Sequence, residues 1–279
     1  MFLINGLAGQ NIDVSDRGLQ YGDGLFETIE VSDGQLVFFD RHLRRLEAGC
    51  KRLSIPFPGS DVIVSEAASL AREQAKAVLK IILTRGHGGR GYRQPDVVIP
   101  SRIVSLHPYP DYPQALYSEG VRVRICETRL GLNPALAGIK HLNRLEQVLA
   151  RAEWSDAAIH EGLMLDVDGH VIEGTMTNLF YVSKGRLYTS PVQRAGIAGI
   201  IREILIELAE SNDLEVNEQF FRLDELLKAD EVFVCNSVIG LWPVAMIDQK
   251  KFAVGPMTRV LSHWLTQFKQ NWILDAQDH

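Results

Sequence analysis

Lys140 is the residue of this sequence whose surroundings best suit covalent chemistry. It stands in Gly138-Ile139-Lys140-His141-Leu142, where a glycine-containing loop passes into a helical pattern and apolar residues flank the lysine. Removing a lysine from water disfavours its charged form, so a desolvated amine can act as nucleophile or base near neutral pH. A solvated surface lysine, the commoner case, is the alternative at this point.

Three segments after Lys140 offer a carboxylate and two anion sites. Glu173 precedes a glycine at a predicted strand end, where a buried carboxylate beside a ring nitrogen would keep that nitrogen protonated. Residues 195–202 place glycines at the start of an apolar helix, whose free N–H groups and dipole favour a phosphate. Asn236 and Ser237 end a later strand with small polar groups, which could bind phosphate oxygens or a carboxylate and so form the second anion site. Each feature alone is also typical of ordinary turns and helix starts.

A glycine-rich segment, Gly86-His87-Gly88-Gly89-Arg90-Gly91, matches the dinucleotide fingerprint GxGxxG and follows an apolar strand. That fingerprint must also open a helix, and the prolines at 95 and 100 exclude one here. We expect instead a loop that presents Arg90 and Tyr92 to an anionic ligand, because arginine binds carboxylates through two parallel hydrogen bonds. A mobile surface loop and a non-catalytic nucleotide-binding module remain alternatives.

The composition is that of an ordinary globular protein, with 46% hydrophobic and 23% charged residues. A net charge of −6 argues against binding to nucleic acid. The histidines are scattered and the three cysteines lie far apart, so we predict neither a metal site nor a disulfide framework. The sequence begins without the basic region of a signal peptide, and no apolar run approaches the ~20 residues of a membrane span. We therefore expect a cytoplasmic protein that does not act at a membrane.

Hydrophobic periodicity predicts helices and strands in the first part of the chain. Residues 26–39 form a hairpin pattern that turns at Asp33-Gly34, and Asp40 is positioned to cap a following helix that ends before Pro56. A helix over 62–74 and strands over 78–84 and 103–107 follow. The stiff segment Pro108–Pro113 then marks a domain boundary.

The second part shows the same mixture of strands and helices. We expect a helix whose inner face carries Leu142, Leu145, Leu149 and Ala152, and a hairpin turning at Asp168-Gly169. The other predicted elements are strands over 121–125, 178–182, 186–188, 232–235 and 244–247, a helix from about 199 with Ile201, Leu205 and Leu208 inward, and a last helix holding Val260, Leu261, Trp264 and Phe268. The expected fold class is mixed α+β/α/β, with a small N-terminal α/β domain over 1–110 and a larger C-terminal domain over 111–279.

These segments, in this order, resemble the fold-type IV pyridoxal-phosphate enzymes, which include class IV aminotransferases and aminodeoxychorismate lyases. The segments that carry the resemblance are His42–Leu46 with its arginine, Lys140, Glu173–Phe180, Gly199–Arg202, and Asn236-Ser237 before Pro243-Val244. Residues 131–147 around Lys140, and Arg90-Gly91-Tyr92, are similar to the lyase branch.

The resemblance implies a two-domain fold-type IV enzyme, with a mixed, barrel-like sheet in the larger domain, and a homodimer. It implies pyridoxal 5'-phosphate as cofactor, carried by Lys140 as a Schiff base, with Glu173 as the partner of the pyridine nitrogen. The other implied cofactor ligands are Arg45, Asn178, Ser237 and the backbone N–H groups of Ile200 and Ile201. The candidate substrate contacts are Arg90, Tyr92, Tyr109 and Asn236, and Thr28 is a candidate proton relay whose alternative is a plain strand threonine.

The activity implied by the lyase branch is conversion of 4-amino-4-deoxychorismate into 4-aminobenzoate and pyruvate, a step of folate biosynthesis. Lys140 would remove the proton from the amine-bearing ring carbon, and loss of the enolpyruvyl group would make the ring aromatic. The main alternative is an aminotransferase of D-amino or branched-chain amino acids that uses the same lysine.

Overall fold

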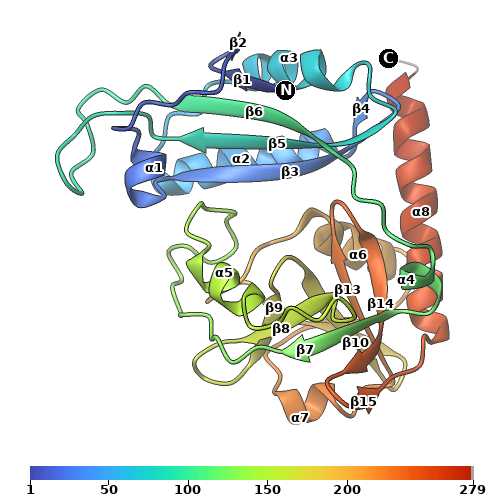
Figure 1. Cartoon of the computed structure of the whole chain (residues 1–279). Helices are drawn as coiled ribbons and strands as arrows, with labels where there is room; N and C mark the ends of the chain where they lie inside the picture. The colour runs from blue at the N-terminus through green and yellow to red at the C-terminus, as the bar shows by residue number, and fades with distance from the viewer. Residues whose placement is uncertain (278–279) are drawn as a thin grey trace. The chain divides into compact units, whose positions relative to one another are not determined.

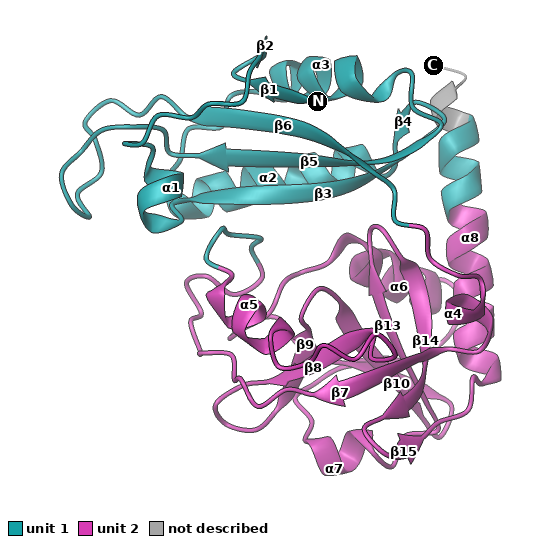
Figure 2. Cartoon of the chain, viewed as in Figure 1, with its two compact units in different colours: residues 1–110, 139–143, 269–279 teal, residues 111–138, 144–268 magenta. Residues whose placement is uncertain are grey.

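The computed structural model describes residues 1–277, which divide into two compact units (Figure 1, Figure 2). Unit 1 contains residues 1–110, 139–143 and the chain from Lys269, and unit 2 contains residues 111–138 and 144–268. The chain thus passes between the units inside the proline-rich segment, and the short Lys140 segment groups with unit 1. The last two residues of the predicted C-terminal domain lie outside the described residues, and the division into functional domains stays a prediction.

Unit 1 is an antiparallel sheet covered on one face by two helices. Its six strands follow the order β2-β1-β6-β5-β3-β4. The bounds are β1 Phe2–Ile4, β2 Leu7–Ala8, α1 Arg17–Tyr21, β3 Gly24–Ser32, β4 Gln35–Leu36, α2 Phe39–Leu53, α3 Ser60–Ala71, β5 Lys76–Thr84 and β6 Ser101–Pro108. Leu25 of β3 packs against Gly49 of α2, where an added Cβ would come within 2.8 Å of the leucine, and Arg102 of β6 pairs with Glu66 of α3. The two helices therefore lie on the face that carries Leu25, Ile29 and Val31.

The hairpin between β3 and β4 confirms the turn predicted at Asp33-Gly34. Both turn residues have positive φ, 48° and 78°, which matches the twist that a tight two-residue hairpin requires. The second arm is shorter than predicted, because the chain enters α2 at Phe39. The predicted cap at Asp40 is wrong: the N-cap position is Phe38, and Asp40 lies in the first helical turn, where it pairs with Arg44.

Unit 2 contains a sheet of mixed sense that closes on itself. The bounds are α4 Ala115–Ser118, β7 Val121–Ile125, α5 Leu145–Arg151, β8 Glu161–Leu165, β9 Val171–Gly174, β10 Asn178–Ser183, β11 Arg186–Thr189, α6 Ile200–Glu210, β12 Val216–Glu218, α7 Leu223–Leu226, β13 Glu231–Asn236, β14 Gly240–Ile247, β15 Lys250–Lys251 and α8 Pro256–Gln277, whose residues from Lys269 on belong to unit 1. Strands β10-β13-β14-β7-β8-β9 pair in sequence, and β9 returns to β10 through the pair Glu173 and Asn178. Because β7 runs parallel to both its neighbours and the other pairs of this closed ring are antiparallel, the predicted mixed, barrel-like sheet is confirmed.

Helix α5 differs from its prediction. It begins at Leu145, so Leu142 lies before it, and Leu145 and Leu149 are 76% and 61% exposed, while Ala150 is buried. The segment before α5 pairs with β3 instead: the Leu142 N–H donates to the Gly24 carbonyl, and His141 lies opposite Leu25 in an antiparallel bridge. Of the helices described, none has the length and apolar character to cross a membrane.

Candidate functional site

The backbone of Lys140 is bound to the edge of the unit 1 sheet. The Phe26 N–H donates to the Lys140 carbonyl at 2.9 Å, and the Leu142 N–H donates to the Gly24 carbonyl at 3.0 Å. These two bonds align the segment antiparallel to the start of β3, with Leu25 opposite His141. Lys140 as a whole is half-buried, and its ammonium lies 4.4 Å from the centre of the Phe26 ring. An amine is thus held on an aromatic surface by a fixed backbone.

A second lysine faces the same ring. Side chains alternate along a strand, so Phe26 and Thr28 share one face of β3, the face opposite the helices. Lys80 of β5 is the register partner of Thr28, and its ammonium lies 5.3 Å from the Phe26 ring centre. The structure therefore brings together the predicted Lys140 and Thr28 with Lys80, which was not predicted. A lysine inside the apolar run of β5 was the signal that could have identified it.

Arg45 projects from α2 toward the opposite face of β3, where it forms two hydrogen bonds with buried Glu27. Its Nε donates to Oε1 at 2.8 Å and its Nη2 donates to Oε2 at 2.5 Å. The Nδ1 atom of buried His42 lies 2.6 Å from the same Oε2. Burial alone would raise the pKa of Glu27, but Arg45 and His42 outweigh it and hold the pKa at about 2. Burial lowers the pKa of His42, so the ring is neutral and donates through Nδ1.

The three predicted substrate contacts of unit 1 lie in connecting segments. Arg90 and Tyr92 belong to the loop between β5 and β6, where residues 86–100 contain no helix, as predicted; both side chains are exposed. The ring of Tyr92 contacts that of Tyr21 edge-on, with centroids 5.6 Å apart. Tyr109 follows β6, and the Lys76 ammonium lies 3.9 Å from its ring centre. A dinucleotide-binding helix is thus excluded at this loop.

Glu173 is buried at the end of β9. Its Oε2 accepts a hydrogen bond of 2.8 Å from the Ile197 N–H. Arg144, which was not predicted, supplies a nearby positive charge. Burial lowers the pKa of its guanidinium, and the attraction between this guanidinium and the Glu173 carboxylate opposes that lowering. Glu173 therefore sits among groups that favour its charged form.

The N-terminus of α6 lies beside the strand that follows Glu173. Asn178 of β10 donates through Nδ2 to the Ile197 carbonyl at 2.9 Å, and its Oδ1 approaches Gly199 so closely that an added Cβ would lie 1.9 Å away. Gly199 caps α6 without a side-chain hydrogen bond. The N–H groups of Ile200 and Ile201, in the first helical turn, have no partner within the helix, an arrangement that favours a negatively charged group.

Asn236 and Ser237 lie in the turn between β13 and β14. Asn236 Oδ1 accepts from the N–H groups of Val238 and Ile239 at 2.8 and 2.9 Å, and its Nδ2 donates to the Met176 carbonyl at 3.1 Å. The amide therefore shapes the turn and ties it to the segment after Glu173. Ser237 is half-buried in the same turn.

Glu161 organises the segment between Glu173 and Asn178, and sequence reasoning missed it. It is fully buried, and its two oxygens accept from the N–H groups of Gly162, Thr175 and Met176 and from the hydroxyls of Thr175 and Thr177. Burial raises its pKa against the effect of these donors. Gly174 has no space for a Cβ, which would lie 2.7 Å from Glu161 Oε2. The turn that follows Glu173 is thus built around this carboxylate.

Three potential metal-binding side chains, Asp166, Asp168 and His170, lie together in the hairpin between β8 and β9. Asp166 Oδ1 accepts from the N–H groups of Asp168 and His170 at 2.9 Å each, and Asp168 pairs with Arg194. The bonding of the hairpin itself accounts for this cluster.

Comparison with known proteins identifies the family. Residues 24–247 match the sequence profile described as Amino-transferase class IV. The chain belongs to the class IV aminotransferase family. It is 40% identical to an aminodeoxychorismate lyase of Vibrio harveyi, over 94% of this chain and 98% of that protein. It is 31% identical to a putative branched-chain-amino-acid aminotransferase of Methanocaldococcus jannaschii, over 96% and 94% of the two chains.

A solved structure extends the likeness to three dimensions. The crystal structure of 4-amino-4-deoxychorismate lyase from Pseudomonas aeruginosa matches with a TM-score of 0.92 and 46% identity, over 96% of this chain and 98% of that one. Class IV aminotransferases and their lyase relatives depend on pyridoxal 5'-phosphate. The expectations of a fold-type IV fold and of this cofactor are therefore confirmed.

The side chains of this class IV chain suit that cofactor chemically. Lys140 would provide an amine for its aldehyde, and buried Glu173 would provide a carboxylate for its pyridine nitrogen. The first turn of α6, where Asn178 leaves no room for a side chain on Gly199, would provide backbone donors for a phosphate.

Proposed function

We propose that this chain is a pyridoxal-phosphate-dependent lyase that converts 4-amino-4-deoxychorismate into 4-aminobenzoate and pyruvate. The observation that carries the proposal is Lys140, whose backbone is fixed on β3 and whose amine lies on the Phe26 ring. The lyases at 40% and 46% identity, matched over nearly their whole length, favour this reaction over that of the aminotransferases at 31% and 30%. When bound, the cofactor supplies a sink for the electron pair left by a departing proton.

The chain's own residues handle the proton and the charges. Lys140 takes the proton from the ring carbon that bears the amine, and the backbone bonds of its segment to Phe26 and Gly24 of β3 hold it in place for this step. Glu173 would hold the cofactor by accepting a hydrogen bond from its protonated pyridine nitrogen. The C–O bond to the enolpyruvyl group then breaks, the ring becomes aromatic, and the departing enol takes up a proton to become pyruvate. Thr28, on the same strand face, is our candidate for delivering that proton.

The binding roles follow from chemical type. Arg45, the first turn of α6, Asn178 and Ser237 hold the phosphate end of the cofactor. Arg90, Tyr92, Tyr109 and Asn236 contact the substrate, and Lys80, opposite Thr28, adds a cation for one of its two carboxylates.

We also propose that the protein acts as a homodimer in the cytoplasm, within folate biosynthesis. Three apolar side chains of α5, Leu145, Val148 and Leu149, are exposed, which is typical of a surface that a second copy covers. Three buried cysteines carry free thiols, and burial raises the pKa of each to about 12, which suits a reducing compartment.

The decisive experiment incubates the purified holoenzyme with 4-amino-4-deoxychorismate and follows pyruvate and 4-aminobenzoate together. We expect both products in equal amounts, and loss of both in Lys140→Ala. Absence of pyruvate, with rapid amino transfer from a D- or branched-chain amino acid to 2-oxoglutarate, would show that the chain is an aminotransferase. A visible absorption band that Lys140→Ala loses excludes a non-catalytic nucleotide-binding module.

A further inference from the structure

The loop that carries Arg90 and Tyr92 has little intrinsic preference for one conformation. Four of its glycines, Gly86, Gly88, Gly89 and Gly91, have positive φ, between 60° and 107°. Glycine reaches such angles without strain but loses the most conformational entropy when it is fixed. Some other part of the molecule must therefore select the observed loop shape.

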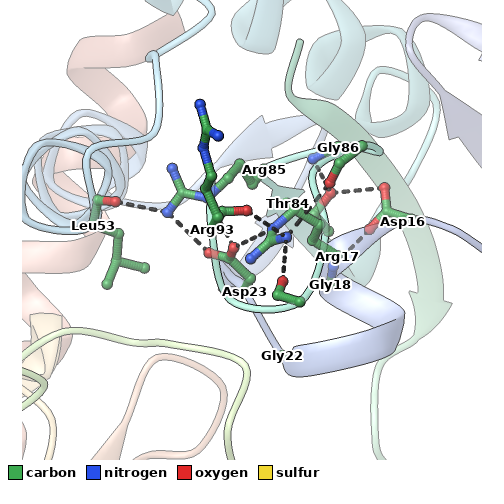
Figure 3. A network of polar contacts seen from close by, with 12 residues as sticks. Asp16, Arg17, Gly18, Gly22, Asp23, Leu53, Thr84, Arg85, Gly86 and Arg93 are labelled. Carbon is green, nitrogen blue, oxygen red and sulfur yellow. Dashed lines mark hydrogen bonds and ion pairs between the residues drawn. The ribbon is translucent and has the colours of Figure 1, made fainter. Parts of the chain in front are cut away.

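Arg17, the first residue of α1, makes that selection. Although cationic, it is only 4% exposed. Its Nη1 points at three carbonyl oxygens of the loop, those of Gly91 at 3.0 Å, Arg93 at 3.4 Å and Gly88 at 3.5 Å. The Arg17 backbone N–H also donates to the Gly86 carbonyl at 2.8 Å (Figure 3). One side chain and its own amide thus bind the loop along its length.

The neighbouring residues hold Arg17 and the loop ends in place. Arg17 Nε donates to Asp23 Oδ2 at 2.9 Å, and burial of Asp23 is outweighed by its hydrogen bonds from Arg85 and Arg17, which hold its pKa below the usual range. Asp16 Oδ2 accepts from Thr84, at the start of the loop, and from Ser101, at its end. The charge of Arg17 is therefore neutralised on one side while its Nη1 stays aimed at the loop.

The guanidinium of Arg17 reaches Tyr92 through a ring contact. Its Cζ lies 4.9 Å from the centre of the Tyr21 ring, and Tyr21 contacts Tyr92 edge-on. Arg90 lies next to Gly91, whose carbonyl accepts the shortest of the three loop bonds. Tyr92 is thus linked to Arg17 through one ring, that of Tyr21. Arg90 is the sequence neighbour of Gly91, whose carbonyl Arg17 binds.

We propose that Arg17 is the positioning residue that fixes the glycine-rich loop in one conformation and thereby sets where Arg90 and Tyr92 meet the substrate's carboxylates. The placement of Arg90 and Tyr92 against the substrate rests on the proposed function, whereas the fixing of the loop by Arg17 does not. Preorganising a binding loop removes the ordering cost from the binding step, so its loss weakens substrate binding in the ground and transition states alike.

The test uses Arg17→Lys, with Arg85→Lys as the matched control. Both arginines bind Asp23, but Arg85 directs its other donors to the carbonyls of Leu53 and Ser54, away from the loop. Lysine keeps the charge but cannot bridge Asp23 and the loop carbonyls at once. A second variant, Gly89→Ala, leaves Asp23 untouched and places a Cβ 2.6 Å from the Arg93 carbonyl and 3.3 Å from Arg17 Nη1.

The first readout is trypsin cleavage of the folded holoenzyme after Arg90 and Arg93. We expect Arg17→Lys and Gly89→Ala to be cut at least about tenfold faster than the unaltered chain, because local opening becomes easier by ~1.4 kcal/mol or more. Arg85→Lys should be cut at the original rate. Unchanged cleavage in Arg17→Lys would refute the positioning role, whatever reaction the protein catalyses.

The second readout is steady-state kinetics with 4-amino-4-deoxychorismate. We expect KM to rise about tenfold in Arg17→Lys and Gly89→Ala while kcat and the visible absorption band change little, since Lys140 is untouched. Faster cleavage with an unchanged KM would refute the link to the substrate and leave the proposed function standing. If the unaltered enzyme forms no pyruvate, the proposed function fails, and with it the assignment of substrate to this loop.

Discussion

The buried carboxylate of Glu27 should make the protein's stability depend on pH in a defined range. Arg45 and His42 bring the pKa of Glu27 from its ordinary 4.5 to about 2. At about 1.4 kcal/mol per pKa unit, this difference corresponds to about 3 kcal/mol of stabilisation. Because the folded pKa is depressed, the stabilisation is complete above about pH 5 and disappears as the pH falls toward 2, with about 2 kcal/mol lost by about pH 3.

The contribution of Glu27 can be isolated by comparing the full chain with Glu27→Gln in urea unfolding at pH 7 and pH 3. At pH 7 we expect the variant to be less stable by about 3–5 kcal/mol, the usual cost of leaving a buried charge without its partner. At pH 3 the difference should shrink by about 2 kcal/mol, because the unaltered chain has lost that much of the pair. A difference that is the same at both pH values would show that Glu27 is not an ionised partner of Arg45.

The same substitution tests the role proposed for Arg45. Without the two hydrogen bonds that it donates to the Glu27 carboxylate, Arg45 loses its fixed orientation, so the dissociation constant of pyridoxal 5'-phosphate should rise about tenfold, or ~1.4 kcal/mol. Spectroscopic titration of the cofactor measures this. Glu30→Gln is the control, because Glu30 lies on the opposite face of β3 and pairs with Lys269. Equal affinities in the two variants would argue against Arg45 as a phosphate ligand.

Three further predictions concern unit 2. Glu161→Gln leaves backbone donors of the turn after Glu173 without an anionic acceptor, so urea unfolding should show a loss of about 1–3 kcal/mol, and a loss below ~0.5 kcal/mol would contradict the role of Glu161. Gly199→Ala places a Cβ 1.9 Å from Asn178 Oδ1 and should raise the cofactor's dissociation constant at least about tenfold in the same titration. Leu149→Glu should shift the protein from dimer to monomer in size-exclusion chromatography with light scattering, whereas Val167→Glu, also at an exposed apolar residue, should not.

The elements that the sequence predicted well are those whose signals are local. The strand Val121–Ile125 was predicted at the bounds that the structure has, because alternation over five residues is itself the property that puts one side in the core. The turn at Asp33-Gly34 was predictable for a similar reason, since only certain residue pairs tolerate two successive positive φ angles. Neither feature depends on a distant partner.

The prediction that failed at α5 shows where local signals end. Leu142, Leu145 and Leu149 have helical spacing, and spacing alone assigns them to one buried face. In the structure the segment before the helix pairs with β3, a strand far earlier in the chain, with the N–H of Leu142 bonded to Gly24 and His141 opposite Leu25, and the helix begins at Leu145. Spacing reports which residues can share a face, but it does not report a pairing with a distant strand.

The same reasoning explains why the chemistry of Lys140 was only partly predictable. Its apolar neighbours in sequence suggested a desolvated amine, and Ile139 is indeed buried. Yet the surface on which the ammonium lies is the Phe26 ring, and the second cation at that ring is Lys80 of a third segment. The two lysines meet at this ring only once β3 and β5 have paired, with Thr28 opposite Lys80. The surroundings of the Lys140 amine are therefore a product of sheet register, which no window of sequence around Lys140 contains.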